Sequence, residues 1–126
     1  MSRNVLLIED EPNISEAIRF LLTRDGWQVD THADGTDAVE VIRSASPDLV
    51  ILDVMLPGRS GMEILRDLRS GETTRDLPVL MLTARGQSRD RDMAEKAGVS
   101  RFMTKPFSNQ EVLTAVRDLH AQASRP

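Results

Sequence analysis

The chain has 126 residues, a mass of 14.0 kDa, 16 Lys and Arg against 20 Asp and Glu, and a formal net charge of −4. This length fits one domain, and 40% hydrophobic with 29% charged residues is typical of a folded, water-soluble protein. The absence of cysteine excludes disulfides, thiolate zinc sites and cysteine nucleophiles, and two histidines are too few for a histidine metal cage.

No apolar run approaches the ~20 residues that span a bilayer, and the first residues lack the apolar stretch of a secretory signal. The mildly acidic balance also disfavours direct binding to DNA. We therefore expect a cytoplasmic domain, without membrane or nucleic-acid binding, whose chemistry comes from carboxylates, hydroxyls and amines.

Short apolar runs alternate with longer amphipathic stretches along the chain. Three continuous runs suit strands buried on both faces, and two weaker segments complete the set: Val5–Ile8, Gln28–Ala33, Leu49–Leu52, Val79–Leu82 and Arg101–Thr104. Apolar residues at helical spacing follow each strand, within Ile14–Leu22, Ala38–Ile42, Met62–Leu68, Met93–Ala97 and Val112–Leu119. This order predicts a doubly wound α/β fold, (βα)5, in which right-handed crossovers place helices on both faces of a five-stranded parallel sheet.

Residues at the segment boundaries agree with these elements. Pro12 suits a first helical position, because its missing N–H would be unpaired there. Glycines that follow three periodic stretches predict left-handed caps, at Gly26, Gly71 and Gly98. Ser108 and Glu111 have the spacing of a capping box for the last helix. The small, polar end is either a frayed terminus or the start of a linker, so we assign residues 1–121 to the domain and 122–126 to a tail.

Polar residues follow the predicted strands at their carboxyl ends, where open parallel sheets bind ligands. They converge on one rim and are Glu9, Asp10 and Glu11 after the first strand, Asp53 after the third, Thr83 after the fourth, and Thr104, Lys105 and Pro106 at the end of the fifth. Simpler roles exist for several of them, since acids at strand ends cap helices or face water, and a threonine caps helices too. Asp53 lacks such a role, because it lies between Leu52 and Val54 and no helix follows it immediately.

A cluster of carboxylates favours a bound cation. Two unit charges ~4 Å apart repel by about 4 kcal/mol at an effective dielectric constant of ~20. Oxygen ligands without His or Cys select a hard ion, which favours Mg²⁺ over Zn²⁺. Mg²⁺ beside a lysine ammonium suits a phosphoryl group, and the best available nucleophile is a carboxylate, which would form an aspartyl phosphate.

Four segments resemble the motifs of the receiver (CheY-like) domain of two-component response regulators, in that family's order and over essentially the whole chain. They are Val5–Pro12, Leu49–Gly58 with Gly61, Met81–Ala84, and Thr104–Phe107. The resemblance implies the flavodoxin-like strand order 2-1-3-4-5. It also implies a phosphoacceptor protein of a phosphorelay rather than a conventional enzyme, with Mg²⁺-dependent self-phosphorylation from a phosphodonor.

By this resemblance, Asp53 accepts a phosphoryl group from a sensor histidine kinase or a histidine phosphotransferase. Glu9, Asp10, Asp53 and the backbone carbonyl of Met55 bind Mg²⁺, for which Mn²⁺ can substitute. Lys105 pairs with the phosphate charge.

The resemblance further assigns the switch and the access to the site. Thr83 turns its hydroxyl toward the phosphate and Phe102 moves inward with it, which changes the face made by the fourth helix, fifth strand and fifth helix. A downstream protein, or an output domain outside this chain, reads that face. The remaining implied positions are the loop residues Pro57 and Gly61, the small Ala84 that leaves the approach open, and Pro106, whose bond to Lys105 is typically cis in the family.

Two departures from the family pattern carry expectations. Phe102 stands where many relatives have Tyr, so no phenol is available for an outward hydrogen bond. Val99-Ser100-Arg101 replaces paired acids that join an intermolecular salt-bridge face in many DNA-binding relatives, and we expect the unphosphorylated chain to be mainly monomeric. Met55 and Arg85 flank the approach of a hydrolytic water by resemblance, and neither is a general base at neutral pH, so we expect slow autodephosphorylation.

Three other classes remain to be distinguished. A haloacid-dehalogenase-type phosphatase would need a second Asp two residues after its nucleophile, where Asp53 is followed by Val54-Met55. A flavodoxin-like mononucleotide binder would need a Ser-, Thr- and Gly-rich loop after the first strand, where the acids would repel phosphate. A degenerate receiver would act only as a binding module, although all the residues for phosphorylation are present.

Overall fold

The computed structural model describes residues 3–83 and 88–123, apart from the side chain of residue 88. Five strands alternate with five helices. In chain order they are β1 Asn4–Ile8, α1 Pro12–Arg24, β2 Gln28–His32, α2 Ala38–Ala45, β3 Leu49–Asp53, α3 Gly61–Ser70, β4 Val79–Thr83, α4 Ser88–Ala97, β5 Arg101–Thr104 and α5 Asn109–Ala123. The predicted order of strands and helices is confirmed, and the differences lie at the ends of the elements.

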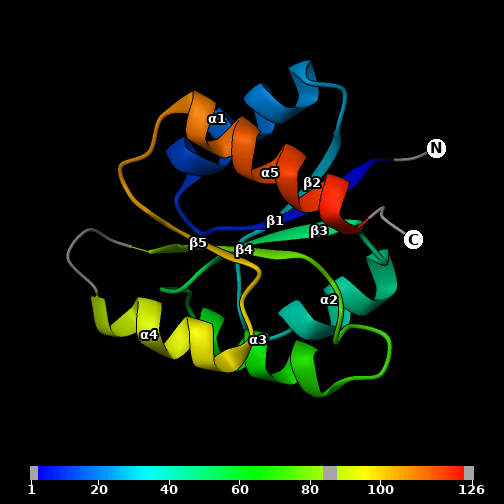
Figure 1. The fold of residues 1–126 in the computed structure, drawn as a ribbon, viewed down its shortest axis with the longest axis vertical. Helices are drawn as coiled ribbons and strands as arrows, with labels where there is room; N and C mark the ends of the chain where they lie inside the picture. Colours follow the sequence, from blue (N-terminus) through cyan, green and yellow to red (C-terminus); the bar gives the residue numbers. More distant parts are fainter. Residues whose placement is uncertain (1–2, 84–87, 124–126) are drawn as a thin grey trace.

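The strands form one parallel sheet in the order β2-β1-β3-β4-β5, which confirms the expected fold. Helices α1 and α5 cover one face of the sheet, and α2, α3 and α4 cover the other (Figure 1). Alternate residues of β1 face opposite layers: Val5 and Leu7 pack with the α1 and α5 side, whereas Leu6 and Ile8 pack with the α2, α3 and α4 side. The central strands are therefore buried on both faces, as continuous apolar runs require.

The helix ends confirm most of the boundary predictions. Pro12 begins α1, and Ser108 and Glu111 exchange the two hydrogen bonds of a capping box at α5. Gly26 and Gly98 have left-handed backbones, with φ of 94° and 93°. The prediction for Gly71 is wrong, because its backbone is extended (φ −90°, ψ 140°).

A second turn explains the conformation of Gly71. Its carbonyl oxygen accepts hydrogen bonds from the N–H groups of Thr74 and Arg75, at 3.4 and 2.9 Å. The residue therefore starts a new turn instead of reversing the chain.

Two other helix ends differ from the sequence prediction. The left-handed cap of α2 falls on Ser46 (φ 49°), and α5 continues to Ala123, two residues past the boundary proposed from composition.

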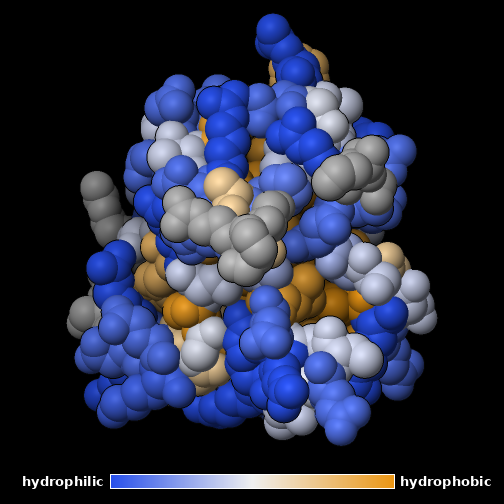
Figure 2. All heavy atoms as spheres, turned by 45° about the vertical axis from the view of Figure 1, so that its right-hand side comes forward, coloured by the Kyte–Doolittle hydropathy of each residue, from blue (hydrophilic) through white to orange (hydrophobic). Residues whose placement is uncertain are grey.

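Hydrophilic residues cover most of the face drawn in Figure 2, and hydrophobic ones emerge in a band between the two helical layers. Among the helices of residues 3–83 and 88–123, none is long and apolar enough to cross a membrane.

Candidate functional site

Three carboxylates meet at the carboxyl edge of the sheet. Glu9 directly follows β1 and Asp53 ends β3, and these strands are neighbours with Ile8 opposite Leu52. Each of Glu9, Asp10 and Asp53 offers an oxygen atom, and these atoms all lie within 4.8 Å of one another. Glu9 and Asp53 are buried, whereas Asp10 is exposed, so the cluster opens to solvent on the Asp10 side. The sequence correctly predicted that these residues converge.

The ammonium group of Lys105 joins this cluster. Its Nζ lies 3.2 Å from Asp53 Oδ2 and 3.1 Å from Glu9 Oε1. The backbone N–H of Lys105 donates to the carbonyl oxygen of Thr83 at 2.8 Å, and the bond from Lys105 to Pro106 is cis. Burial alone would lower the pKa of Lys105, but the carboxylates of Asp53 and Glu9 outweigh it and raise that pKa above its ordinary value. Lys105 is therefore a fixed positive charge at the site.

Glu9 is the carboxylate with the most perturbed environment. Its Oε2 accepts the N–H of Glu11 at 3.1 Å, and its buried Oε1 has the ammonium group of Lys105 as an ion-pair partner, also at 3.1 Å. Burial, followed by a side-chain interaction with Asp53, raises the pKa of Glu9 from 4.5 to about 7. The single positive charge of Lys105 therefore cannot neutralise the negative charges of both buried carboxylates, Glu9 and Asp53.

The loop after β3 is held close to the phosphoacceptor candidate. The N–H of Met55 donates to Asp53 Oδ1 at 3.4 Å, and its side chain is 70% exposed. Gly61 packs against the end of β3: its N–H donates to the carbonyl oxygen of Val54 at 2.9 Å, and a Cβ would overlap the carbonyl oxygen of Asp53. The resemblance supplied Gly61 as a motif residue, and the structure gives the steric reason for it.

The loop after β2 packs against the loop after β3. The carbonyl oxygen of the exposed Pro57 accepts a hydrogen bond from the N–H of Gly35 at 2.9 Å. A Cβ on Gly35 would overlap the backbone of Arg59, and a Cβ on Gly58 would overlap the hydroxyl of Thr36. The loops after β2 and β3 therefore fit together through two glycines, which fixes the position of the loop beside Asp53.

The two residues expected to form the switch contact α4. Thr83 is 1% exposed at the end of β4, and its hydroxyl donates to Asp90 Oδ2 at 3.1 Å. Phe102 is half-buried, with the guanidinium of Arg91 5.5 Å from its ring centre. Neither Asp90 nor Arg91 was predicted from the sequence, because their polar side chains on a charged helix look like an ordinary solvated surface.

Other predicted positions have simpler surroundings or are not described. Arg101, within the segment expected to lack the paired acids, forms an ion pair with Asp118 of α5 at 3.2 Å. Ala84 and Arg85 lie outside the residues that the structure describes.

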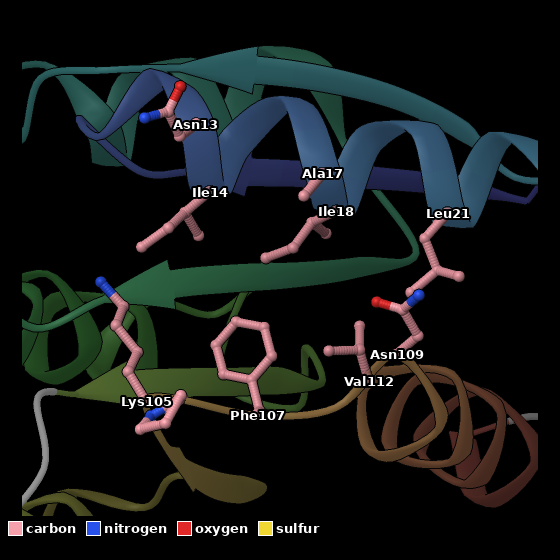
Figure 3. A pocket seen from close by; sticks show the side chains of 10 residues that line it. Asn13, Ile14, Ala17, Ile18, Leu21, Lys105, Phe107, Asn109 and Val112 are labelled. Atoms are coloured by element: carbon pink, nitrogen blue, oxygen red, sulfur yellow. The ribbon is translucent and has the colours of Figure 1, made fainter.

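An apolar cavity of about 460 Å³ adjoins the site between α1 and α5. Figure 3 shows Ile14, Ile18 and Leu21 of α1 facing Phe107 and Val112 across it. Lys105 also lines this cavity, which therefore meets the carboxylate cluster at that residue. The helical pattern predicted that these α1 residues face inward, but not that the packing leaves a cavity there.

The comparisons with known proteins place the chain in a family. Residues 5–117 match the response regulator receiver domain, and the chain belongs to that family. A putative response regulator from Chloroflexus aurantiacus is 31% identical, with 96% of this chain and 99% of that chain covered and a TM-score of 0.91. The signal receiver domain of a signal transduction histidine kinase from Syntrophus aciditrophicus is 29% identical, with 99% and 95% covered and a TM-score of 0.91.

A third similar structure is the BeF3-activated N-terminal receiver domain of RstA from Klebsiella pneumoniae, 30% identical, with 93% of this chain and 97% of that chain covered and a TM-score of 0.83. The chain is thus a receiver domain of the two-component type, which is a signalling domain rather than a conventional enzyme. The resemblance drawn from the four sequence motifs is confirmed.

Proposed function

We propose that this receiver domain accepts a phosphoryl group on Asp53 from a phosphohistidine of a sensor histidine kinase or histidine phosphotransferase. One observation carries the proposal: the Asp53 carboxylate ends the central strand β3 in an acidic cluster and has a lysine ammonium 3.2 Å away. Family membership supports a role in two-component signalling, and the competing phosphatase and flavin-binding classes have no such support.

The transfer needs no group beyond those of the two proteins and a cation. A carboxylate oxygen of Asp53 attacks phosphorus while the phosphorus–nitrogen bond of the phosphohistidine breaks. The leaving ring nitrogen keeps the electron pair of that bond, and the other ring nitrogen carries a proton, so neutral imidazole departs. Lys105 offsets the negative charge of the phosphoryl oxygens from its position beside Asp53.

The donor set at the rim fits a hard divalent cation such as Mg²⁺ or Mn²⁺. Its ligands would be Glu9, Asp10, Asp53 and the backbone carbonyl of Met55, all of them oxygen donors. The burial of Glu9 beside Asp53 and the raised pKa of Glu9 support this assignment, because one lysine ammonium lies between two buried carboxylates. When bound, such a cation supplies charge that neutralises the phosphoryl oxygens during transfer.

The cavity between α1 and α5 is the contact surface that we assign to the phosphodonor protein. The cavity reaches Lys105, so an apolar side chain seated there would anchor a donor helix close to Asp53. Asn109 also lies on its lining, and its side-chain amide would hydrogen-bond to that helix.

Intact-mass spectrometry after incubation with a small phosphodonor and Mg²⁺ tests the proposal. We expect the wild type to gain one phosphoryl group and Asp53→Asn to gain none. Asp10→Asn should still be modified but should require a higher Mg²⁺ concentration, and Asp92→Asn, on the exposed surface of α4, should behave as wild type. Full labelling of the Asp53 variant, or steady release of phosphate without a stable adduct, would overturn the assignment.

A further inference from the structure

The beginning of α4 contacts both residues of the expected switch. Asp90 accepts the hydroxyl of Thr83, and the next residue, Arg91, places its guanidinium by the ring of Phe102. These four residues belong to three different elements, β4, α4 and β5. Two consecutive side chains of one helix thus hold the two groups through which phosphorylation would act.

We propose that Asp90 is a positioning residue that holds Thr83 in the unphosphorylated arrangement and competes with a phosphoryl group on Asp53 for the single proton of the Thr83 hydroxyl. The inference rests on the proposed function, because the competitor is the phosphoryl group on Asp53. A hydroxyl has one proton to donate, so Thr83 cannot serve Asp90 and a phosphoryl oxygen together.

The surroundings make this exchange energetically significant. Thr83 is almost fully buried and Asp90 is half-buried, so the hydrogen bond is partly shielded from water and has a charged acceptor. Thr83 is adjacent to Leu82, which pairs with Asp53 in the sheet, and the N–H of Val54 donates to the carbonyl oxygen of Leu82 at 2.9 Å. The Thr83 hydroxyl therefore lies on the strand next to Asp53, close enough to respond to a phosphoryl group on that residue.

Release of Asp90 would affect the first turn of α4, because the apolar contacts of this helix lie further along it. Of its described side chains only Ala94 is fully buried, whereas Met93 and Ala97 are half-buried and the charged residues Asp92, Glu95 and Lys96 are exposed. Loss of the Thr83 bond would leave the first turn of α4 free to shift, and Arg91 would move with it relative to Phe102. Asp90 thereby connects the phosphoryl group to the α4–β5–α5 face.

The test combines amide NMR spectra with titration by beryllofluoride and Mg²⁺ as a phosphoryl mimic. In free Asp90→Ala, amide signals of β5 and α5 should move along the line from the free to the beryllofluoride-bound wild type. Its apparent affinity for beryllofluoride should rise about tenfold, the effect of losing one competing hydrogen bond to a charged acceptor. Asp90→Asn keeps an acceptor oxygen and should give an intermediate shift.

Two controls separate this effect from a change of charge or helix stability. Asp92→Ala removes the same charge from an exposed position of the same helix and should leave spectra and affinity unchanged. In a Thr83→Val background, Asp90→Ala should have no further effect. The inference is wrong, while the proposed function stands, if Asp90→Ala has the same effect as Asp92→Ala. It is also wrong if the effect of Asp90→Ala persists in the Thr83→Val background. If the wild type fails to bind beryllofluoride or to accept a phosphoryl group, the inference and the proposed function both fail.

Discussion

The stability of the cation-free domain should decrease as pH rises from about 4.5 to about 7, because of Glu9. Its carboxyl group has an ordinary pKa of 4.5 and a pKa of about 7 in the folded protein. Between these values the folded state holds a proton on Glu9 that the unfolded state has released. Folding is therefore favoured at the acidic end of this window, and the contribution is lost as pH rises through the folded pKa.

The magnitude follows from the size of the change in pKa. At 1.36 kcal/mol per pH unit, a rise from 4.5 to about 7 corresponds to about 3 kcal/mol of unfolding free energy. The side chain of Glu9 is fully buried, so solvent screening reduces this value little. For a domain with a total stability of ~5–15 kcal/mol, such a loss is readily measured.

Urea unfolding at a series of pH values, in the presence of EDTA, measures the effect. The one tryptophan, Trp27, is 2% exposed and gives a fluorescence signal for global unfolding. Glu9→Gln removes the titrating group but keeps its size, so the difference between wild type and this variant isolates Glu9 from other carboxyl groups. Glu72→Gln, at an exposed position, is the matched control and should show the pH dependence of the wild type.

We expect the wild type to lose about 3 kcal/mol relative to Glu9→Gln between pH 4.5 and pH 7.5, and saturating Mg²⁺ to remove most of that difference. A difference that stays constant over this range would refute the reasoning that burial keeps Glu9 protonated. A difference that persists in saturating Mg²⁺ would refute the assignment of Glu9 to a cation site.

Three further outcomes are expected. Gly61→Ala should lower the free energy of unfolding in urea by about 1–3 kcal/mol and slow phosphorylation, because a Cβ would lie 2.9 Å from Val54 Cα and overlap the Asp53 carbonyl. A variant as stable as the wild type would contradict this. Met55→Asn should accelerate decay of the phosphorylated protein several-fold by mass spectrometry, since an amide can orient a water where methionine cannot, and an unchanged half-life would count against that role. Light scattering at micromolar concentration should give a monomer before phosphorylation, and a stable dimer would show that Arg101 does not disfavour association.

The sequence predicted the fold closely because its signals were local and mutually consistent. Runs such as Leu49–Leu52 are too short and too apolar for surface helices, and each is followed by a stretch at helical spacing. Gly71 shows the limit of such reading: a glycine after a helix fits either a left-handed cap or the start of a new turn. Only the hydrogen bonds to its carbonyl oxygen decide between them.

For the candidate site, the sequence could place residues at strand ends but could not give side-chain partners. Glu9, Asp53 and Lys105 meet because parallel strands end at one edge, which topology alone requires. The contact between Thr83 and Asp90 depends on the path of α4 over the sheet, and an acidic residue in a charged helix gives no signal of it. The cavity beside Lys105 likewise depends on the spacing of two helices far apart in the chain.

The close fit of the loops after β2 and β3 restricts where the carboxyl edge of the sheet can be extended or labelled. Gly35 and Gly58 leave no room for a Cβ, so neither loop can lengthen or gain side chains without separating from the other. The turn that begins at Gly71 lies at the opposite edge, between α3 and β4, and Glu72 within it is exposed. Because the chain has no cysteine, a Glu72→Cys variant would carry one attachment point for a fluorophore, away from both the acidic rim and the glycine-packed loops.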